Sequence, residues 1–260
     1  MNKIFNEDCI TTMQRPEMEG KVDLVITSPP YNTSRVGASD KYNSRYDTFQ
    51  DFKSDQDYID WTIDVFNGYD KVLRKDGCVL YNISYSSENT HLIWLVVADI
   101  IRRTNFTTAD CIIWKKSNAL PNNRSKNKLT RIVEYVFVFV RKKEIKTFDA
   151  NKKVRSVIEK TGQANYENVY NFFEAKNNDG SNDLNKATFS TDFVKRLLYI
   201  YAKENSLVYD SFMGIGTTAK GCIEASMRYV GSEISEAQIS SFKEWEKKRN
   251  ETMLSQKTLF

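Results

Sequence analysis

Short apolar runs and stretches of helical spacing follow one another along the chain. Residues 21–26 are largely apolar, as in a strand buried on both faces of a parallel sheet. Residues 55–73 then repeat aromatic and aliphatic side chains at the spacing of one helix face. The same reasoning predicts strands at 78–83 and 110–114, with a helix at 92–102 between them. Helix and strand therefore alternate as in a doubly wound α/β sheet.

This alternation is interrupted by polar segments and then resumes. Residues 134–140 are a clear strand, whereas 151–183 are polar, rich in amides and nearly without periodicity. A helix is expected at 193–203, with its cap among residues 190–192. A polar segment at 32–53 is expected to be a mobile loop. The last part of the chain predicts a strand, a helix and a strand at 206–210, 217–225 and 228–231.

Composition excludes several classes of protein. The chain of 260 residues is long enough for one large domain with a full core. Its apolar runs are far too short to cross a bilayer, and its first residues lack the features of a secretory signal, which predicts a cytoplasmic protein. Four dispersed cysteines and the single His91 argue against a zinc site, a disulfide framework and a Ser-His-Asp hydrolase.

Basic residues are concentrated in one part of the chain. The net charge is only +4, but residues 115–176 hold 15 basic and 6 acidic side chains. Amide side chains lie among the cations, a composition suited to contacts with phosphates and base edges. A solvated polar loop would have the same composition. The candidates for DNA contact are Lys115, Lys116, Asn118, Arg124, Lys126 and Lys128.

A stiff turn follows the first predicted strand. Ser28-Pro29-Pro30-Tyr31 begins where the apolar run ends, and two consecutive prolines cannot continue a sheet ladder. Each proline also restrains the residue before it, so the backbone of this turn is preset. Functional groups are expected here, because ligands bind at the carboxyl ends of strands in α/β sheets.

A glycine-rich loop follows the predicted strand at 206–210. Gly214 and Gly216 permit a tight turn and close backbone approach to a ligand. Glu233 comes nineteen residues after Gly214, at the tip of the next strand, where a carboxylate can bind a ribose diol. The loop is therefore expected to hold a nucleoside. The candidate ligands in this region are Asp210, Phe212, Gly214, Gly216, Thr217, Thr218 and Glu233.

Glycine loops of this kind bind dinucleotides as well as methyl donors, and some are purely structural turns. Asp210 favours the methyl donor. A carboxylate attracts the ammonium and sulfonium groups of S-adenosylmethionine, whereas it repels a pyrophosphate.

The two motifs together resemble the S-adenosylmethionine-dependent DNA amino-methyltransferases. Residues 26–31 match the form of the catalytic turn associated with N4-cytosine enzymes, and residues 210–218 are similar to the cofactor loop. The cofactor loop follows the catalytic turn, as in the permuted β group. Residues 6–10 resemble that group's amino-terminal motif, in which an Asp, here Asp8, contacts the adenine of the cofactor. Residues 187–190 stand where related sequences often read His-Pro-x-x-Phe, in a degenerate form.

The resemblance implies a Rossmann-like methyltransferase fold: a mostly parallel twisted sheet with helices on both faces and a basic recognition insertion. Residues 1–114 and 181–260 would form the catalytic and cofactor-binding domain, and 115–180 the target-recognition insertion. Double-stranded DNA would be the partner, in bacteria, archaea or phage, with a restriction endonuclease of the same specificity as a further candidate. Neither a metal nor a membrane is implied, and the protein would be a monomer or homodimer.

The chemistry of the turn agrees with this resemblance. The exocyclic amino nitrogen of a base is a poor nucleophile, because its lone pair is conjugated with the ring. The Ser28 hydroxyl and the carbonyls around Pro29 and Pro30 can accept its hydrogens, and Tyr31 can stack on a base flipped out of the duplex. Ser28 favours N4 of cytosine. N6-adenine methylation, a nucleotide-dependent oxidoreductase and a non-catalytic DNA-binding module are the alternatives.

Overall fold

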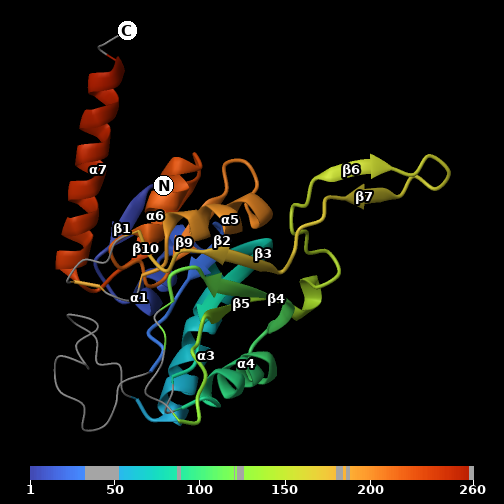
Figure 1. Cartoon of the computed structure of the whole chain (residues 1–260), viewed down its shortest axis with the longest axis horizontal. Coiled ribbons are helices and arrows are strands. Elements are labelled where there is room, and N and C mark those ends of the chain that lie inside the picture. Colours follow the sequence, from blue (N-terminus) through green and yellow to red (C-terminus); the bar gives the residue numbers. More distant parts are fainter. Residues whose placement is uncertain are drawn as a thin grey trace.

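A computed structural model describes residues 1–32, 53–86, 89–119, 121, 126–179, 184–185 and 188–257. Its centre is an eight-stranded sheet in the order β1-β10-β9-β2-β3-β5-β4-β8 (Figure 1). Among these strands only β5 runs antiparallel to its neighbours. The predicted α/β fold with a mostly parallel sheet is confirmed. In sheet order the strands span Lys3–Phe5, Arg228–Ser232, Leu207–Asp210, Val22–Thr27, Leu73–Ile83, Val133–Arg141, Phe106–Lys116 and Phe172–Ala175.

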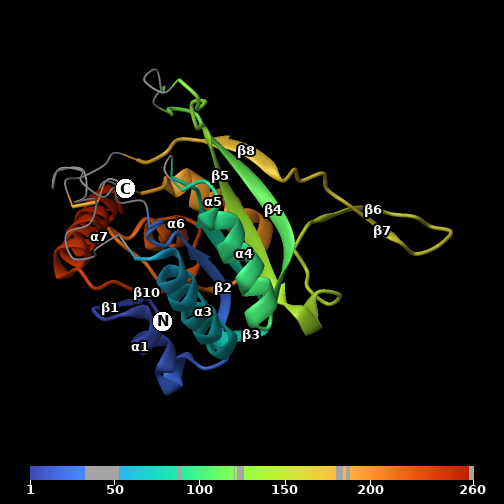
Figure 2. The ribbon, with the colours of Figure 1, turned by 90° about the horizontal axis from the view of Figure 1, so that it is seen from below.

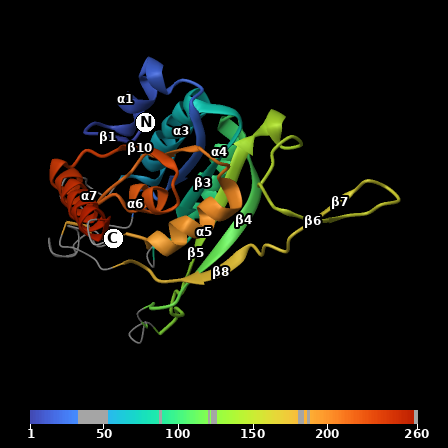
Figure 3. The ribbon, with the colours of Figure 1, turned by 90° about the horizontal axis from the view of Figure 1, so that it is seen from above.

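Helices cover both faces of the sheet. One face carries α1 (Cys9–Gln14), α3 (Asp55–Val72) and α4 (Leu92–Arg103), as the view from below shows (Figure 2). The other face carries α5 (Thr191–Tyr201), α6 (Thr217–Glu224) and part of α7 (Glu236–Lys257) (Figure 3). Short 3-10 turns, η1 and η2, span Pro16–Met18 and Lys142–Glu144.

Strand β2 shows why the sheet needs two helical layers. Val25 packs into the core below the sheet, whereas Leu24 and Ile26 pack into the core above it. The alternation of side chains along a strand therefore places apolar groups on both faces, as the uninterrupted apolar run predicts.

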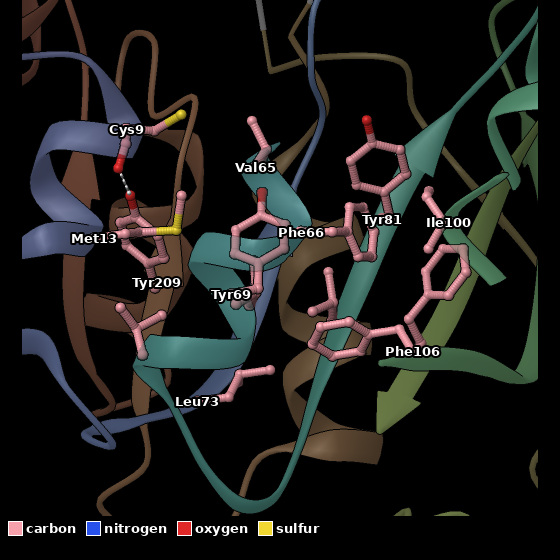
Figure 4. Packing of buried hydrophobic residues seen from close by; sticks show 14 of the residues in the cluster. Cys9, Met13, Val65, Phe66, Tyr69, Leu73, Tyr81, Ile100, Phe106 and Tyr209 are labelled. Carbon is pink, nitrogen blue, oxygen red and sulfur yellow. Dashed lines mark hydrogen bonds between the residues drawn. The ribbon is translucent and has the colours of Figure 1, made fainter. Parts of the chain in front are cut away.

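Aromatic side chains are prominent in the core between the sheet and helices α1, α3 and α4. Phe66 on α3 makes edge-to-face contacts with Tyr69, Tyr81, Phe106 and Phe139, at centroid distances of 5.2, 5.2, 5.5 and 5.0 Å (Figure 4). This geometry adds about 0.5–1.5 kcal/mol per pair to the gain from burial. The cluster fixes α3 against β3, and α3 in turn supplies side chains to the site described below.

Several elements differ from the predictions. Strands β3 and β4 begin earlier than expected, at Leu73 and Phe106, and the long helix α7 was not predicted. Residues 151–183 contain strand β8 and a two-stranded ribbon of β6 (Val154–Val157) and β7 (Ala164–Tyr166), which projects away from the body (Figure 1). Most of the segment at 32–53 lies outside the described residues. Within the described part of the chain, no helix combines the length and hydropathy required to span a membrane.

The predicted insertion at 115–180 does not coincide with a break in the fold. Strand β5 is central to the sheet, between β3 and β4, and β8 pairs with β4 along its edge. Among the described residues of 115–180, those outside the sheet include part of the β4–β5 connection, η2 and the β6–β7 ribbon.

Candidate active site

The two sequence motifs meet at the carboxyl edge of the sheet. Strands β2 and β9 are parallel neighbours, with Leu24 opposite Val208 and Val25 opposite Tyr209, so the segments that follow them start side by side. One pocket is lined by Ser28 and Pro30 from the first motif and by the loop from Asp210 to Ile215. Residues separated by about 180 positions therefore share a single cavity.

Carboxylates are the charged groups of this pocket. Its described lining includes Glu7, Asp8, Asp210 and Glu233, and neither lysine nor arginine is among the lining residues described. Such a wall fits a ligand with an ammonium and a sulfonium group, and it opposes the two negative charges of a pyrophosphate. The four carboxylate side chains of the pocket therefore fit S-adenosylmethionine better than a dinucleotide.

Asp210 joins the glycine loop to β2, the strand that precedes the Ser28–Tyr31 turn. Its carboxylate accepts hydrogen bonds from the hydroxyls of Thr27 (2.7 Å) and Thr218 (2.5 Å) and from the backbone N–H of Phe212 (3.0 Å). Burial raises the pKa of Asp210 to about 6, although these hydrogen bonds oppose the increase. The group therefore carries its charge at neutral pH and loses most of it in mildly acidic solution.

The glycine loop is held in place by Glu233. The Glu233 carboxylate accepts the backbone N–H groups of Gly214 (2.7 Å) and Ser235 (2.8 Å). Gly214 has a φ of 55°, in the left-handed region that favours glycine. Asp8, Phe212 and Thr217 also line the pocket, and Asp8 caps α1 through a 2.8 Å bond from the N–H of Ile10.

Gly216 and Thr218 do not line the pocket in the structure. Gly216 begins α6 with a φ of 80°, and a Cβ atom there would lie 2.3 Å from the Phe242 ring of α7. Thr218 is fully buried against Asp210. The lack of a side chain at Gly216 makes room for α7 in this structure, and its approach to a ligand stays a prediction.

The catalytic turn is anchored by a tyrosine from α3. Tyr58 donates a 2.6 Å hydrogen bond to the carbonyl of Pro30, while Pro29 is buried. The Ser28 and Tyr31 hydroxyls lie 2.9 Å apart, and the Tyr31 hydroxyl also contacts side chains from β3 and β5. Tyr31 is therefore held by its hydroxyl, a constraint that the sequence did not indicate.

Three kinds of site residue were missed from the sequence. Trp61 on α3 lines the pocket and packs on Phe212, with ring centroids 5.5 Å apart. Thr188 and Phe189 line it from the degenerate motif, and Asn82 and Glu134 reach the turn from neighbouring strands. Helical spacing predicted the α3 aromatics only as core residues. Asn82 and Glu134 occupy strands whose pairing no local pattern reveals.

The predicted DNA-binding residues have different surroundings. Lys115 pairs with Glu174 at 2.9 Å, Lys116 bonds to Glu134, and the Asn118 side-chain oxygen accepts the N–H of Asn177 at 2.8 Å. Lys126 and Lys128 are exposed, whereas Arg124 lies outside the described residues. Lys116 thus belongs to the group of side chains around the catalytic turn.

Comparisons with known proteins were made on the whole chain. A family model described as DNA methylase, N6_N4_Mtase, matches residues 22–244. Type II methyltransferase M.BglII of Bacillus subtilis is 24% identical over 257 residues, which cover 90% of this chain and 66% of the relative. The chain thus spans just under two thirds of that relative's length.

Solved structures share the fold. The PvuII DNA methyltransferase, described as cytosine-N4-specific, superposes with a TM-score of 0.70 at 17% identity, covering 93% of this chain and 85% of that protein. A complex of M1.HpyAVI with SAM gives a TM-score of 0.62 at 22% identity, with coverages of 94% and 98%.

Proposed function

Because the chain belongs to the DNA methylase family of the N6 and N4 type, we propose that it transfers a methyl group from S-adenosylmethionine to the exocyclic amine of a flipped-out DNA base. The observation that carries this proposal is the shared pocket. Ser28 and Pro30 line it together with Asp210 and Gly214. A base amine at the first pair would face a cationic methyl donor at the second.

The residues of this chain would position the two reactants. When bound, the cofactor supplies an electrophilic methyl group on its sulfonium. Asp210 and Glu233 would attract and orient the cofactor, with Trp61 packed beside Phe212 as an aromatic wall. Ser28 Oγ would accept a hydrogen of the amine and direct its lone pair toward the methyl group.

We infer that N4 of cytosine is the target amine. Ser28 stands where adenine enzymes of the resembling family more often carry Asp or Asn. N6 of adenine presents the same two hydrogens to the same turn and is the second candidate. The β4–β5 connection and the β6–β7 ribbon are the proposed target-recognition elements within residues 115–180, since they lie outside the sheet.

Methyl transfer from tritiated S-adenosylmethionine to long unmodified duplex DNA tests the proposal. The DNA should gain label, and digestion to nucleosides with mass analysis should yield N4-methyldeoxycytidine. N6-methyldeoxyadenosine would identify the second candidate. DNA binding without transfer would indicate a non-catalytic module, and an absorbance change linked to NAD would indicate an oxidoreductase.

A further inference from the structure

A row of polar side chains crosses four neighbouring strands behind the catalytic turn. Ser28 follows β2, Asn82 lies on β3, Glu134 on β5 and Lys116 on β4, which is the order of these strands in the sheet. Glu134 is 8% exposed and lies where β5 begins. A buried carboxylate at this depth is costly unless it is paired and hydrogen-bonded.

Both carboxylate oxygens of Glu134 accept hydrogen bonds. One carboxylate oxygen accepts the Lys116 ammonium, and the other accepts the Tyr31 hydroxyl at 3.0 Å and the Asn82 amide at 2.9 Å. The Lys116 ammonium supplies the opposite charge beside the buried Glu134 carboxylate. An ionised carboxylate only accepts hydrogen bonds, so each neighbouring group must direct a hydrogen toward it.

That constraint fixes the direction of the neighbouring bond. The single hydroxyl hydrogen of Tyr31 goes to Glu134, and Tyr31 also receives a hydrogen from the Asn82 amide at 2.7 Å. Tyr31 then has no hydrogen left for Ser28. In the 2.9 Å contact between the two hydroxyls, Ser28 must therefore be the donor.

The orientation of Asn82 supports the same direction. Its amide nitrogen faces Glu134 and Tyr31, while its oxygen is buried without a partner among the described residues. Exchanging the positions of the Asn82 amide oxygen and nitrogen would point the oxygen at the Glu134 carboxylate and the Tyr31 oxygen. Neither of these has a hydrogen to donate to it. The unpartnered oxygen is the less costly arrangement as long as Glu134 is an acceptor.

We propose that Glu134, paired with Lys116, is a positioning residue that makes Ser28 a hydrogen-bond acceptor toward the pocket. This inference rests on the proposed function. Ser28 Oγ gives its own hydrogen to Tyr31 and accepts the Asn82 amide at 3.4 Å, which leaves one lone pair for the cavity that Ser28 lines. Such a group recognises an amino substituent and rejects an exocyclic carbonyl oxygen at the same position of the base, which would place a second acceptor against it.

The same chain of bonds can take up the proton that methylation releases. When the amine nitrogen gains its methyl group, it gives one hydrogen to Ser28 Oγ as a proton. The Ser28 hydroxyl proton moves to Tyr31, and the Tyr31 proton moves to Glu134, which becomes neutral beside Lys116. Each hydroxyl gives up one proton and receives one, so Ser28 and Tyr31 end unchanged.

The test compares Glu134→Gln with the wild type in single-turnover methyl transfer to long unmodified duplex DNA. A glutamine can donate to Tyr31, which frees the tyrosine hydrogen for Ser28 and reverses the chain of bonds. The transfer rate should fall about 10- to 100-fold, as for loss of an oriented donor or acceptor at a reacting group. The dissociation constants for cofactor and DNA should stay within about twofold, since Glu134 is not among the described residues that line the pocket.

Glu144→Gln is the matched control, because Glu144 is also buried, pairs with Arg141 at 3.3 Å, and lies just beyond the opposite end of β5. It should leave the transfer rate unchanged even where it lowers stability. A readout specific to positioning is the double variant with Tyr31→Phe. Both substitutions break the same chain of hydrogen bonds from Ser28 through Tyr31 to Glu134. The double variant should therefore transfer methyl groups no more slowly than Tyr31→Phe alone.

An unchanged rate in Glu134→Gln, or losses that multiply in the double variant, would overturn the role of Glu134. Failure of the wild type to methylate any base would instead reject the proposed function.

Discussion

Consecutive side chains at the end of β2 have different tasks. Thr27 is fully buried and donates to Asp210, on the side of the expected cofactor. Ser28 faces the pocket and joins the Tyr31, Asn82 and Glu134 network, on the side of the expected base. Thr27 is the last residue of β2 and Ser28 the first of the turn, so a single step along the chain separates the side expected to hold the methyl donor from the side expected to hold the base.

Ser28→Ala should reduce the rate of methyl transfer by about 100-fold or more while leaving cofactor affinity unchanged. The hydroxyl is expected to act on the amine and makes no contact with the Asp210 network. Single-turnover transfer and calorimetric titration with S-adenosylmethionine measure the two effects separately. An alanine variant with normal turnover would remove Ser28 from the mechanism.

The affinity for S-adenosylmethionine should fall as the pH decreases through about 6. The pKa of Asp210 is raised to about 6 by burial, so its carboxyl becomes neutral below that pH and no longer attracts a cation. If only the ionised form binds, the dissociation constant at pH 5 should be about tenfold higher than at pH 7.

Asp210→Asn provides the comparison for this pH dependence. It should bind the cofactor weakly at both pH values, because its side chain is neutral throughout. Calorimetry on both proteins checks the prediction, and equal affinity of the wild type at pH 5 and pH 7 would contradict it.

At the scale of elements, one glycine fixes where α6 begins and how closely α7 packs against it. Gly216 combines a φ of 80° with the contact of its Cα face against Phe242. The glycine turn thus positions a helix that buries Phe242 in the core above the sheet. Its fit to α7 explains the second glycine of the motif without any ligand.

Gly216→Ala should destabilise the protein by about 2–4 kcal/mol, through backbone strain and overlap with the Phe242 ring. Gly20→Ala is the control: Gly20 has a φ of 60°, but no atom lies within 4 Å of its Cβ position. It should cost only the strain, about 1 kcal/mol. Denaturant unfolding of both variants measures the difference, and equal losses would show that the contact with α7 is unimportant.

Sequence patterns predicted the elements whose burial is regular. The apolar run of β2 and the helical spacing of α3 gave their positions to within one residue. Residues 236–257 lack a sustained apolar face, since much of α7 is exposed, and its helix was therefore missed. The β6–β7 ribbon was missed because its side chains are largely exposed and show no inward face.

For the site, the sequence indicated each motif but not the contacts between strands. Ser28 and Asp210 were predicted from turn chemistry and from a carboxylate before the glycines. Glu134 appeared only as part of an apolar strand, because its role depends on β5 lying between β3 and β4. Lys116 was interpreted as a DNA contact from charge alone, and its bond to Glu134 could be seen only in three dimensions.

At the scale of the molecule, some of the basic side chains in residues 115–176 form ion pairs with carboxylates of the same protein. Lys115 and Lys116 bond to Glu174 and Glu134 and are only partly exposed. Lys126 and Lys128, in the connection between β4 and β5, are exposed. That connection leaves the sheet at the edge where the pocket opens, because it follows the carboxyl end of β4. The exposed lysines are therefore the better candidates for phosphate contact.

Replacing Lys126 and Lys128 together with alanine should weaken DNA binding and reduce the slope of log affinity against log salt by roughly one to two units. Lys21 and Lys75 are exposed at the opposite end of β2 and β3, so their double alanine variant is the matched control. It removes the same charge and should leave the slope unchanged. Equal slopes in all three proteins would show that the β4–β5 connection does not face phosphate.

The pairing of β2 with β9 also determines when the sheet around the pocket can form during synthesis of the chain. Leu24 must wait for Val208, its partner 184 residues later, which a ribosome adds after about 10–40 s. Until then the nascent chain can pair β2 with β3, but it lacks β9 and the glycine loop that would bind the methyl donor. Long-range pairing of this kind slows folding, so the pocket proposed for the methyl donor can form only after Val208 has been added to the chain.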